Sequence, residues 1–238
     1  MLYIIGLGLN LKGISVEGFE IVKRCKKIYL EGYTVNFPYA GNVLREFIGK
    51  KIELADREKV EGLEIVDEAK KKDVALLVYG APLIATTHIA LLDEAKKSRV
   101  KCKVIHAGSV LDAIAETGLQ LYKFGKIASM PVWKKNFEPT SFTDVIKDNQ
   151  KIRAHSLILV DIGLPFEKAI EQLEKALQDS GIKLGQFLVC SMLGTKNKKI
   201  YLRTLKEFKE YKIRKPFCFI IPGKMHFVEE GFLRGFRD

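Results

Sequence analysis

Short apolar runs rich in β-branched residues alternate with amphipathic segments along nearly the whole chain. Strands are expected at residues 2–6, 27–31, 74–80, 101–106, 156–162, 186–193 and 217–221. Helices are expected near residues 15–25, 42–48, 58–72, 88–98, 109–118, 142–152 and 166–180 and at the C-terminus, with Ser15 as the N-cap of the first. This alternation is typical of an α/β fold with a largely parallel sheet.

The periodicity breaks at residues 122–140, which contain glycine, proline and the single tryptophan. We place a boundary before this stretch, near residue 112. The chain then divides into an N-terminal α/β lobe, residues 1–112, and a C-terminal α/β lobe, residues 113–238. A cleft between two lobes is a common place for a small ligand, so we expect a ligand there.

With 47% hydrophobic residues, the chain can bury an ordinary globular core. No apolar run approaches the roughly 20 residues that a membrane span needs. The first residues lack the features of a secretion signal, so we expect a cytoplasmic protein with no membrane association. The cysteines form no CxxC pair, which favours reduced thiols over a metal or redox site; they are Cys25, Cys102, Cys190 and Cys218.

The net charge of +11 would attract nucleic acid, acidic lipid surfaces and acidic proteins alike. The densest basic stretch, residues 196–215, holds nine basic and two acidic residues and is expected to be helical. Tyr201, Phe208 and Tyr211 are interleaved in it. Their spacing suits a nucleic-acid groove, but it also suits the inner stripe of an amphipathic helix.

The first expected strand ends in the sequence GLGLN, residues 6–10. Gly6 and Gly8 let the backbone turn tightly and approach a ligand. The dinucleotide-binding pattern GxGxxG needs a third glycine where Leu11 stands. Without this glycine, the main sequence pattern for binding of NAD or FAD is missing.

Two further loops follow expected strands at their carboxyl ends, where open α/β sheets usually place ligands. The sequence YGAPLIATTHIA carries Gly80 and Pro82 and offers Thr86 or Thr87 as the cap of the next helix. The sequence IHAGSVLDA places Ser109 at another junction between strand and helix. Three such junctions in one lobe predict a ligand site.

The histidines show no HExxH or other metal-ligand spacing; they are His88, His106, His155 and His226. We expect His226, in GKMHFVEE, to cap a helix or to lie at the edge of a ligand site. The chain also lacks a GxSxG elbow, a P-loop and a cysteine-nucleophile motif. Metal catalysis, acyl transfer and nucleotide hydrolysis therefore lack the residues they need.

An ordered set of motifs covers nearly the whole chain: MLYIIGLGLN, YLEGYT, ADREKVE, YGAPLIATTH, ETGLQLYKFGK, PTSFTDVI, SLILVDI and IIPGKMHFVEE. This set resembles the diphthine synthase family of the tetrapyrrole methylase superfamily. The resemblance implies a two-lobed fold, with a mainly parallel sheet in the first lobe and a mixed sheet in the second. It also implies a homodimer with S-adenosylmethionine bound between the lobes and S-adenosylhomocysteine as product.

The acceptor that the resemblance implies is the amine of a 3-amino-3-carboxypropyl group on a histidine of elongation factor 2. We expect that this reaction does not require nucleic acid. The cofactor contacts carried over from the family fall on Leu9, Ala81, Ile84, Ser109, Val110, Val160, Leu202 and His226. Family loops usually read Gly-Asp-Pro where this chain has Gly80-Ala81-Pro82, and Leu202 stands where alanine is usual. A buried aspartate at position 81 would contribute about 1–3 kcal/mol to cofactor binding.

Methyl transfer from a sulfonium needs mainly a deprotonated amine aligned with the methyl carbon in a dry site. No general base is identified: His226 is a candidate by location, and Tyr79 and Glu116 have no stronger support. The number of methyl groups added is left open. Two alternatives remain, a sister methyltransferase acting on a tetrapyrrole or ribosomal RNA, and a non-catalytic relative that binds elongation factor 2 or RNA.

Overall fold

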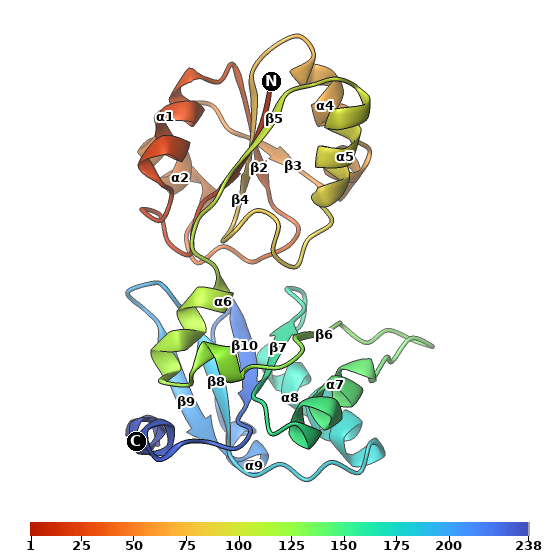
Figure 1. Ribbon diagram of the computed structural model, residues 1–238, viewed down its shortest axis with the longest axis vertical. Helices are drawn as coiled ribbons and strands as arrows, with labels where there is room; N and C mark the ends of the chain where they lie inside the picture. Colours follow the sequence, from red (N-terminus) through yellow and green to blue (C-terminus); the bar gives the residue numbers. More distant parts are fainter. Residues whose placement is uncertain (238) are drawn as a thin grey trace. The chain divides into compact units, whose positions relative to one another are not determined.

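The computed structural model describes residues 1–237 and divides into two compact units, Met1–Asp112 and Ala113–Asp238 (Figure 1). Each unit is built on one five-stranded sheet. The first sheet is entirely parallel and the second is mixed, so the predicted α/β fold class is confirmed.

The first sheet has the strand order β3-β2-β4-β1-β5. Its strands are β1 (Leu2–Gly6), β2 (Lys27–Glu31), β3 (Glu53–Ala55), β4 (Val74–Val78) and β5 (Cys102–Ile105). Helices α1 (Val16–Arg24) and α2 (Gly41–Ile48) cover one face, and α3 (Arg57–Glu61), α4 (Glu64–Ala69) and α5 (Ile89–Lys97) cover the other (Figure 1). Strand β4 is buried along its whole length because helices pack on both faces, which explains its unbroken apolar sequence.

Three local features of this unit differ from what the sequence predicts. The single helix expected at 58–72 is two short helices, because Leu63 takes a left-handed φ of 65° and ends the helical path. Strand β3 has only three residues and was not predicted. Neither Thr86 nor Thr87 is the N-cap of α5; that position is His88, whose side chain makes no capping bond. Ser15 does cap α1, accepting the Gly18 N–H at 3.1 Å.

The second sheet has the order β6-β7-β10-β8-β9, with only β6 and β7 parallel. Its strands are β6 (Ala128–Met130), β7 (Ser156–Val160), β8 (Phe187–Ser191), β9 (Lys199–Arg203) and β10 (Phe217–Ile221). Helices α7 (Ser141–Lys151) and α8 (Phe166–Asp179) pack on it through a core rich in phenylalanine. The smaller helices are α6 (Val110–Ala113), η1 (Ile114–Thr117), η2 (Leu121–Lys123), α9 (Leu205–Phe208), α10 (Phe227–Leu233) and η3 (Arg234–Phe236).

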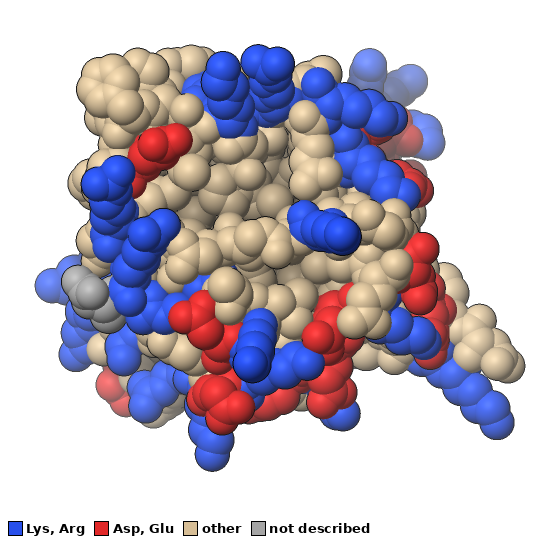
Figure 2. Space-filling model, turned by 90° about the horizontal axis from the view of Figure 1, so that it is seen from below, with Lys and Arg blue, Asp and Glu red and all other residues tan. Residues whose placement is uncertain are grey.

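The helix predicted across the basic stretch 196–215 is wrong. Its first part is edge strand β9, paired antiparallel with β8, and only a short α9 follows. The aromatic residues pack against the core, with the rings of Tyr201 and Tyr211 5.3 Å apart and Phe208 fully buried. Figure 2 shows Lys and Arg side chains spread around one face and mixed with acidic ones, not gathered into one groove. These three aromatic rings are therefore core residues.

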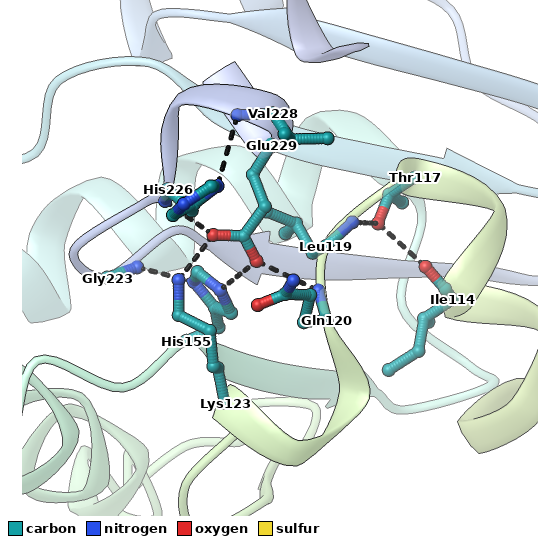
Figure 3. Close-up of polar contacts among 10 residues, drawn as sticks. All are labelled: Ile114, Thr117, Leu119, Gln120, Lys123, His155, Gly223, His226, Val228 and Glu229. Carbon is teal, nitrogen blue, oxygen red and sulfur yellow. Dashed lines mark hydrogen bonds and ion pairs between the residues drawn. The ribbon is translucent and has the colours of Figure 1, made fainter. Parts of the chain in front are cut away.

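A buried carboxylate, Glu229, joins three segments of the second unit (Figure 3). It accepts the backbone N–H of Gln120 at 2.9 Å and that of His226 at 2.7 Å. It also accepts a hydrogen bond from the Lys123 ammonium and one from His155 Nε2 at 3.2 Å. Two motifs of the family resemblance, ETGLQLYKFGK and IIPGKMHFVEE, thus meet at one side chain.

The hydrogen bonds around His155 fix its tautomer. The Gly223 N–H donates to His155 Nδ1 at 2.8 Å, so Nδ1 carries no proton and Nε2 donates to Glu229. Burial lowers the pKa of His155, which keeps the ring neutral. Burial alone would raise the pKa of Glu229, but the bonds from Gln120, Lys123, His226 and His155 outweigh it and hold that pKa at about 2.

We expect Glu229→Gln to destabilise the protein by about 3 kcal/mol at neutral pH, because the amide cannot accept all four donors. A carboxyl pKa lowered from 4.5 to about 2 contributes stability that is complete above pH 4.5 and is lost as pH falls toward 2. The difference in urea-unfolding free energy between wild type and variant should therefore shrink over that range. The exposed neighbour provides the control, since Glu230→Gln should change stability by less than about 0.5 kcal/mol. Equal stability of wild type and Glu229→Gln at pH 7 would contradict this account.

Candidate functional site

The carboxyl ends of three adjacent strands, β4, β1 and β5, carry the three loops singled out by sequence. The loops after β1 and β4 are joined directly. Gly8 donates its N–H to the Gly80 carbonyl at 3.3 Å, and Gly80 returns a bond to the Gly8 carbonyl at 2.9 Å. Both glycines have left-handed φ angles, 65° and 68°, which other residues adopt only with strain.

The third loop meets the other two at Gly6, the last residue of β1. A Cβ at Gly6 would lie 2.7 Å from the Gly80 carbonyl oxygen, 2.9 Å from Ala107 Cβ and 3.0 Å from Pro82 Cδ. There is no room for such an atom. The absence of a side chain at Gly6 therefore lets all three loops converge at one edge of the sheet.

Two predicted cofactor residues, Leu9 and Ser109, lie close to Gly80 of the second loop. A Cβ placed on Gly80 would be 4.0 Å from Leu9 Cδ2 and 3.9 Å from Ser109 Cα. The Leu9 carbonyl accepts a hydrogen bond from the Tyr79 hydroxyl at 3.0 Å. Ser109 donates through both its N–H and its hydroxyl to Asp112 Oδ2, at 2.7 and 2.9 Å. Its hydroxyl oxygen also accepts the Leu111 N–H at 3.1 Å, so the side chain caps the start of α6.

The other three predicted residues of this unit lie on the same loops. Ala81 and Ile84 form a turn, in which the Ile84 N–H reaches the Ala81 carbonyl at 3.3 Å. Ile84 leaves 39% of its surface exposed, so it can offer an apolar contact. Val110, partly buried, begins α6. The fold thus gathers the five first-unit residues at one edge of one sheet.

The three predicted residues of the second unit lie on separate elements. Val160 ends β7, and Leu202 lies in β9, with β10 and β8 between them. Leu202 is only 4% exposed, so it offers little surface to a ligand. His226 is exposed and is the N-cap of α10, its Nδ1 accepting the Val228 N–H at 3.4 Å. The capping role expected for His226 is confirmed, whereas cofactor contact by these three residues stays a prediction.

Two of the candidate bases have other roles. Burial raises the pKa of Tyr79, and its hydroxyl is a donor to Leu9, so it is a neutral group that fixes the first loop. Glu116 forms an ion pair with Lys198. Within residues 1–237, no group of three or more His, Cys, Asp or Glu side chains could hold a metal ion. The four cysteines are free thiols. No helix in the described chain is long and apolar enough to span a membrane.

His88 is a functional-site residue whose role sequence reasoning missed. It is 1% exposed, and its Nδ1 lies 2.9 Å from the Pro82 carbonyl oxygen. A carbonyl only accepts, so Nδ1 carries the proton and the ring anchors the loop that contains Ala81. Its Nε2 is buried without a hydrogen-bond partner among the described residues. Only the position of His88, directly before an amphipathic helix, could have suggested an anchoring role.

We expect Gly6→Ala to destabilise the protein by about 1–3 kcal/mol, because the methyl group must push apart three packed loops. Urea denaturation measures the change. Gly41→Ala is the matched control: Gly41 begins α2, a Cβ there would meet nothing within 4 Å, and we expect stability to be unchanged or slightly higher. Equal effects of the two substitutions would show that Gly6 does not limit the packing of these loops.

The tetrapyrrole (corrin/porphyrin) methylase family matches residues 1–209. A diphthine synthase of Methanococcus maripaludis is 36% identical over 98% of this chain and 98% of its own. A diphthine methyl ester synthase of Schizosaccharomyces pombe is 35% identical over 99% and 94%. A solved crystal structure of diphthine synthase superposes with a TM-score of 0.91 at 32% identity, covering 100% of this chain and 96% of that one. The chain therefore belongs to the tetrapyrrole methylase family and, within it, to the diphthine synthases.

Proposed function

We propose that this methyltransferase uses S-adenosylmethionine to methylate the amine of the 3-amino-3-carboxypropyl group on a histidine of elongation factor 2. The observation that carries the proposal is the similarity to the Methanococcus maripaludis diphthine synthase, which runs over 98% of both chains. The family match over residues 1–209 supports the use of that methyl donor. The homodimer and the cytoplasmic location are part of the same proposal.

The carboxyl edge of the first sheet fits such a cofactor. Ligand sites of this kind combine apolar contacts with a few fixed polar groups. Leu9, Ile84 and Val110 supply apolar side chains, and the glycine-rich loops supply backbone groups that a ligand can approach closely. When bound there, S-adenosylmethionine would supply a methyl group on a positively charged sulfur.

The residues at this edge act by positioning. Tyr79 holds the Leu9 carbonyl and His88 holds the Pro82 carbonyl, so two loops are fixed before any ligand arrives. Such preorganisation contributes to rate when the reacting atoms need only alignment. The acceptor amine must be neutral to attack. Since Tyr79 stays protonated and Glu116 is paired with Lys198, His226, water or the acceptor's own carboxylate is left to take the proton.

The carboxylate of the same acceptor group is a second candidate for methylation. The observation that favours it is the Schizosaccharomyces pombe relative, 35% identical over 99% of this chain, whose name specifies a methyl ester. An ester forms when the methyl group goes to a carboxylate oxygen instead of the amine nitrogen. The two products differ in chemical stability, because hydroxylamine cleaves esters and leaves N-methyl groups intact.

We expect the purified chain to transfer isotope-labelled methyl groups to elongation factor 2 that carries the unmethylated aminocarboxypropyl histidine. The label should survive hydroxylamine, since the proposed acceptor is nitrogen. Elongation factor 2 with an unmodified histidine is the control and should take up no label. Label released by hydroxylamine would instead identify a methyl ester. Binding of elongation factor 2 without transfer would contradict the proposed reaction and identify a non-catalytic binder.

A further inference from the structure

Glu31, the last residue of β2, is a fully buried carboxylate at the same sheet edge. Pairing of Leu30 with Leu77 puts Glu31 beside Val78, the last residue of β4. Val78 is also the partner of Gly6. Glu31 therefore lies in the same terminal row of the sheet as the glycine where the three loops converge.

The carboxylate of Glu31 has two neutral donors. Its Oε1 accepts the Tyr33 N–H at 3.1 Å, and its Oε2 accepts the Thr34 hydroxyl at 2.7 Å. Among residues 1–237, no Lys, Arg or His nitrogen lies within 4.0 Å of the Glu31 carboxylate, the limit for an ion pair. A buried charge without a counter-charge opposes folding.

The two hydrogen bonds of Glu31 organise the turn at Gly32–Thr34. A glutamine amide could make the same two contacts, however, because its oxygen accepts an N–H and its NH₂ can bond the threonine hydroxyl. The turn therefore accounts for the shape of Glu31 but not for its charge. Because the charge of Glu31 does not stabilise the folded chain, we expect this charge to serve the function of the site.

The loop that Glu31 begins is in contact with the candidate cofactor loops. The ring of Phe37 packs 5.4 Å from that of Tyr79, whose hydroxyl holds the Leu9 carbonyl. Tyr39 packs on Phe37 at 5.6 Å, and its hydroxyl is buried without a partner among the described residues. The loop that begins at Glu31 therefore contacts the residue that fixes the first candidate loop.

We propose that Glu31 is the fixed negative charge of the methyl-transfer site. In the reaction, the bond between sulfur and the methyl carbon breaks with its electron pair left on sulfur, while the amine lone pair forms the new bond between carbon and nitrogen. One positive charge passes from sulfur to nitrogen, and a proton then leaves the ammonium. A buried carboxylate at this edge of the sheet stabilises that charge through its field. Because Glu31 touches no solvent, it is a positioning residue that acts through its field and through the 32–34 turn.

This inference rests on the proposed function and deepens it. Methylation of the neutral amine keeps one positive charge at the site, because the sulfonium charge becomes an ammonium charge, whereas methylation of a carboxylate leaves a neutral ester. The field of Glu31 stabilises the ammonium but not the ester, so it favours nitrogen as the acceptor over a carboxylate oxygen.

Calorimetric titration with two cofactor analogues tests the role of the charge. Sinefungin carries a cationic amine in place of the sulfonium methyl, whereas S-adenosylhomocysteine is neutral at sulfur. We expect Glu31→Gln to weaken sinefungin binding by roughly tenfold, as expected for a unit charge about 10 Å away at an effective dielectric near 20. Binding of S-adenosylhomocysteine should stay within about twofold. The variant should also fold at least as stably as wild type, because it buries no charge.

Glu53→Gln is the matched control. Glu53 lies in β3 of the same sheet and pairs with Lys27 and Lys51 near solvent, so its removal changes the net charge equally and should leave both affinities unchanged. An unchanged ratio of affinities in Glu31→Gln, an equal loss of both ligands, or failure of this variant to fold would overturn the role of Glu31. Failure of wild type to bind either ligand would overturn the proposed function itself.

Discussion

The close approach of three loops at Gly6 is the constraint on which the candidate site depends. A single methyl group there would collide with the loops after β4 and β5, so the edge of the sheet can be this compact only with glycine. The Gly8–Gly80 hydrogen bonds then join two of the loops, and Tyr79 and His88 fix their carbonyl groups. The fold thus provides a rigid edge lined by backbone, as a reaction governed by alignment requires.

The two buried carboxylates, Glu229 and Glu31, have different surroundings and different roles. Glu229 receives four donors, one of them the Lys123 ammonium, so its charge is balanced and it holds the second unit together. Glu31 receives only two neutral donors, and no cation compensates it among the described residues. The first arrangement is what stability requires. The second retains a negative potential beside the loops that we propose bind a sulfonium.

Much of the fold follows from the sequence because strand β4 is an unbroken apolar run and the amphipathic helices have a clear hydrophobic period. Prediction failed where local signals compete. The lysine-rich segment has the spacing of an amphipathic helix, but Tyr201 of β9 packs on the core and Leu202 is buried in the sheet. The segment 58–72 is broken by a left-handed Leu63, which no sequence pattern predicts. At the site, glycines mark the loops, yet the anchoring of Pro82 by His88 and the unpaired state of Glu31 depend on contacts that only the folded chain shows.

Hydrogen exchange with and without S-adenosylhomocysteine tests most directly whether the carboxyl edge of the first sheet binds the cofactor. Saturating ligand should slow amide exchange in the loops that follow β1, β4 and β5, at residues 7–15, 79–88 and 106–110. Exchange on the exposed face of α7 should not change. Saturable binding with protection confined to segments outside these three loops would contradict the account.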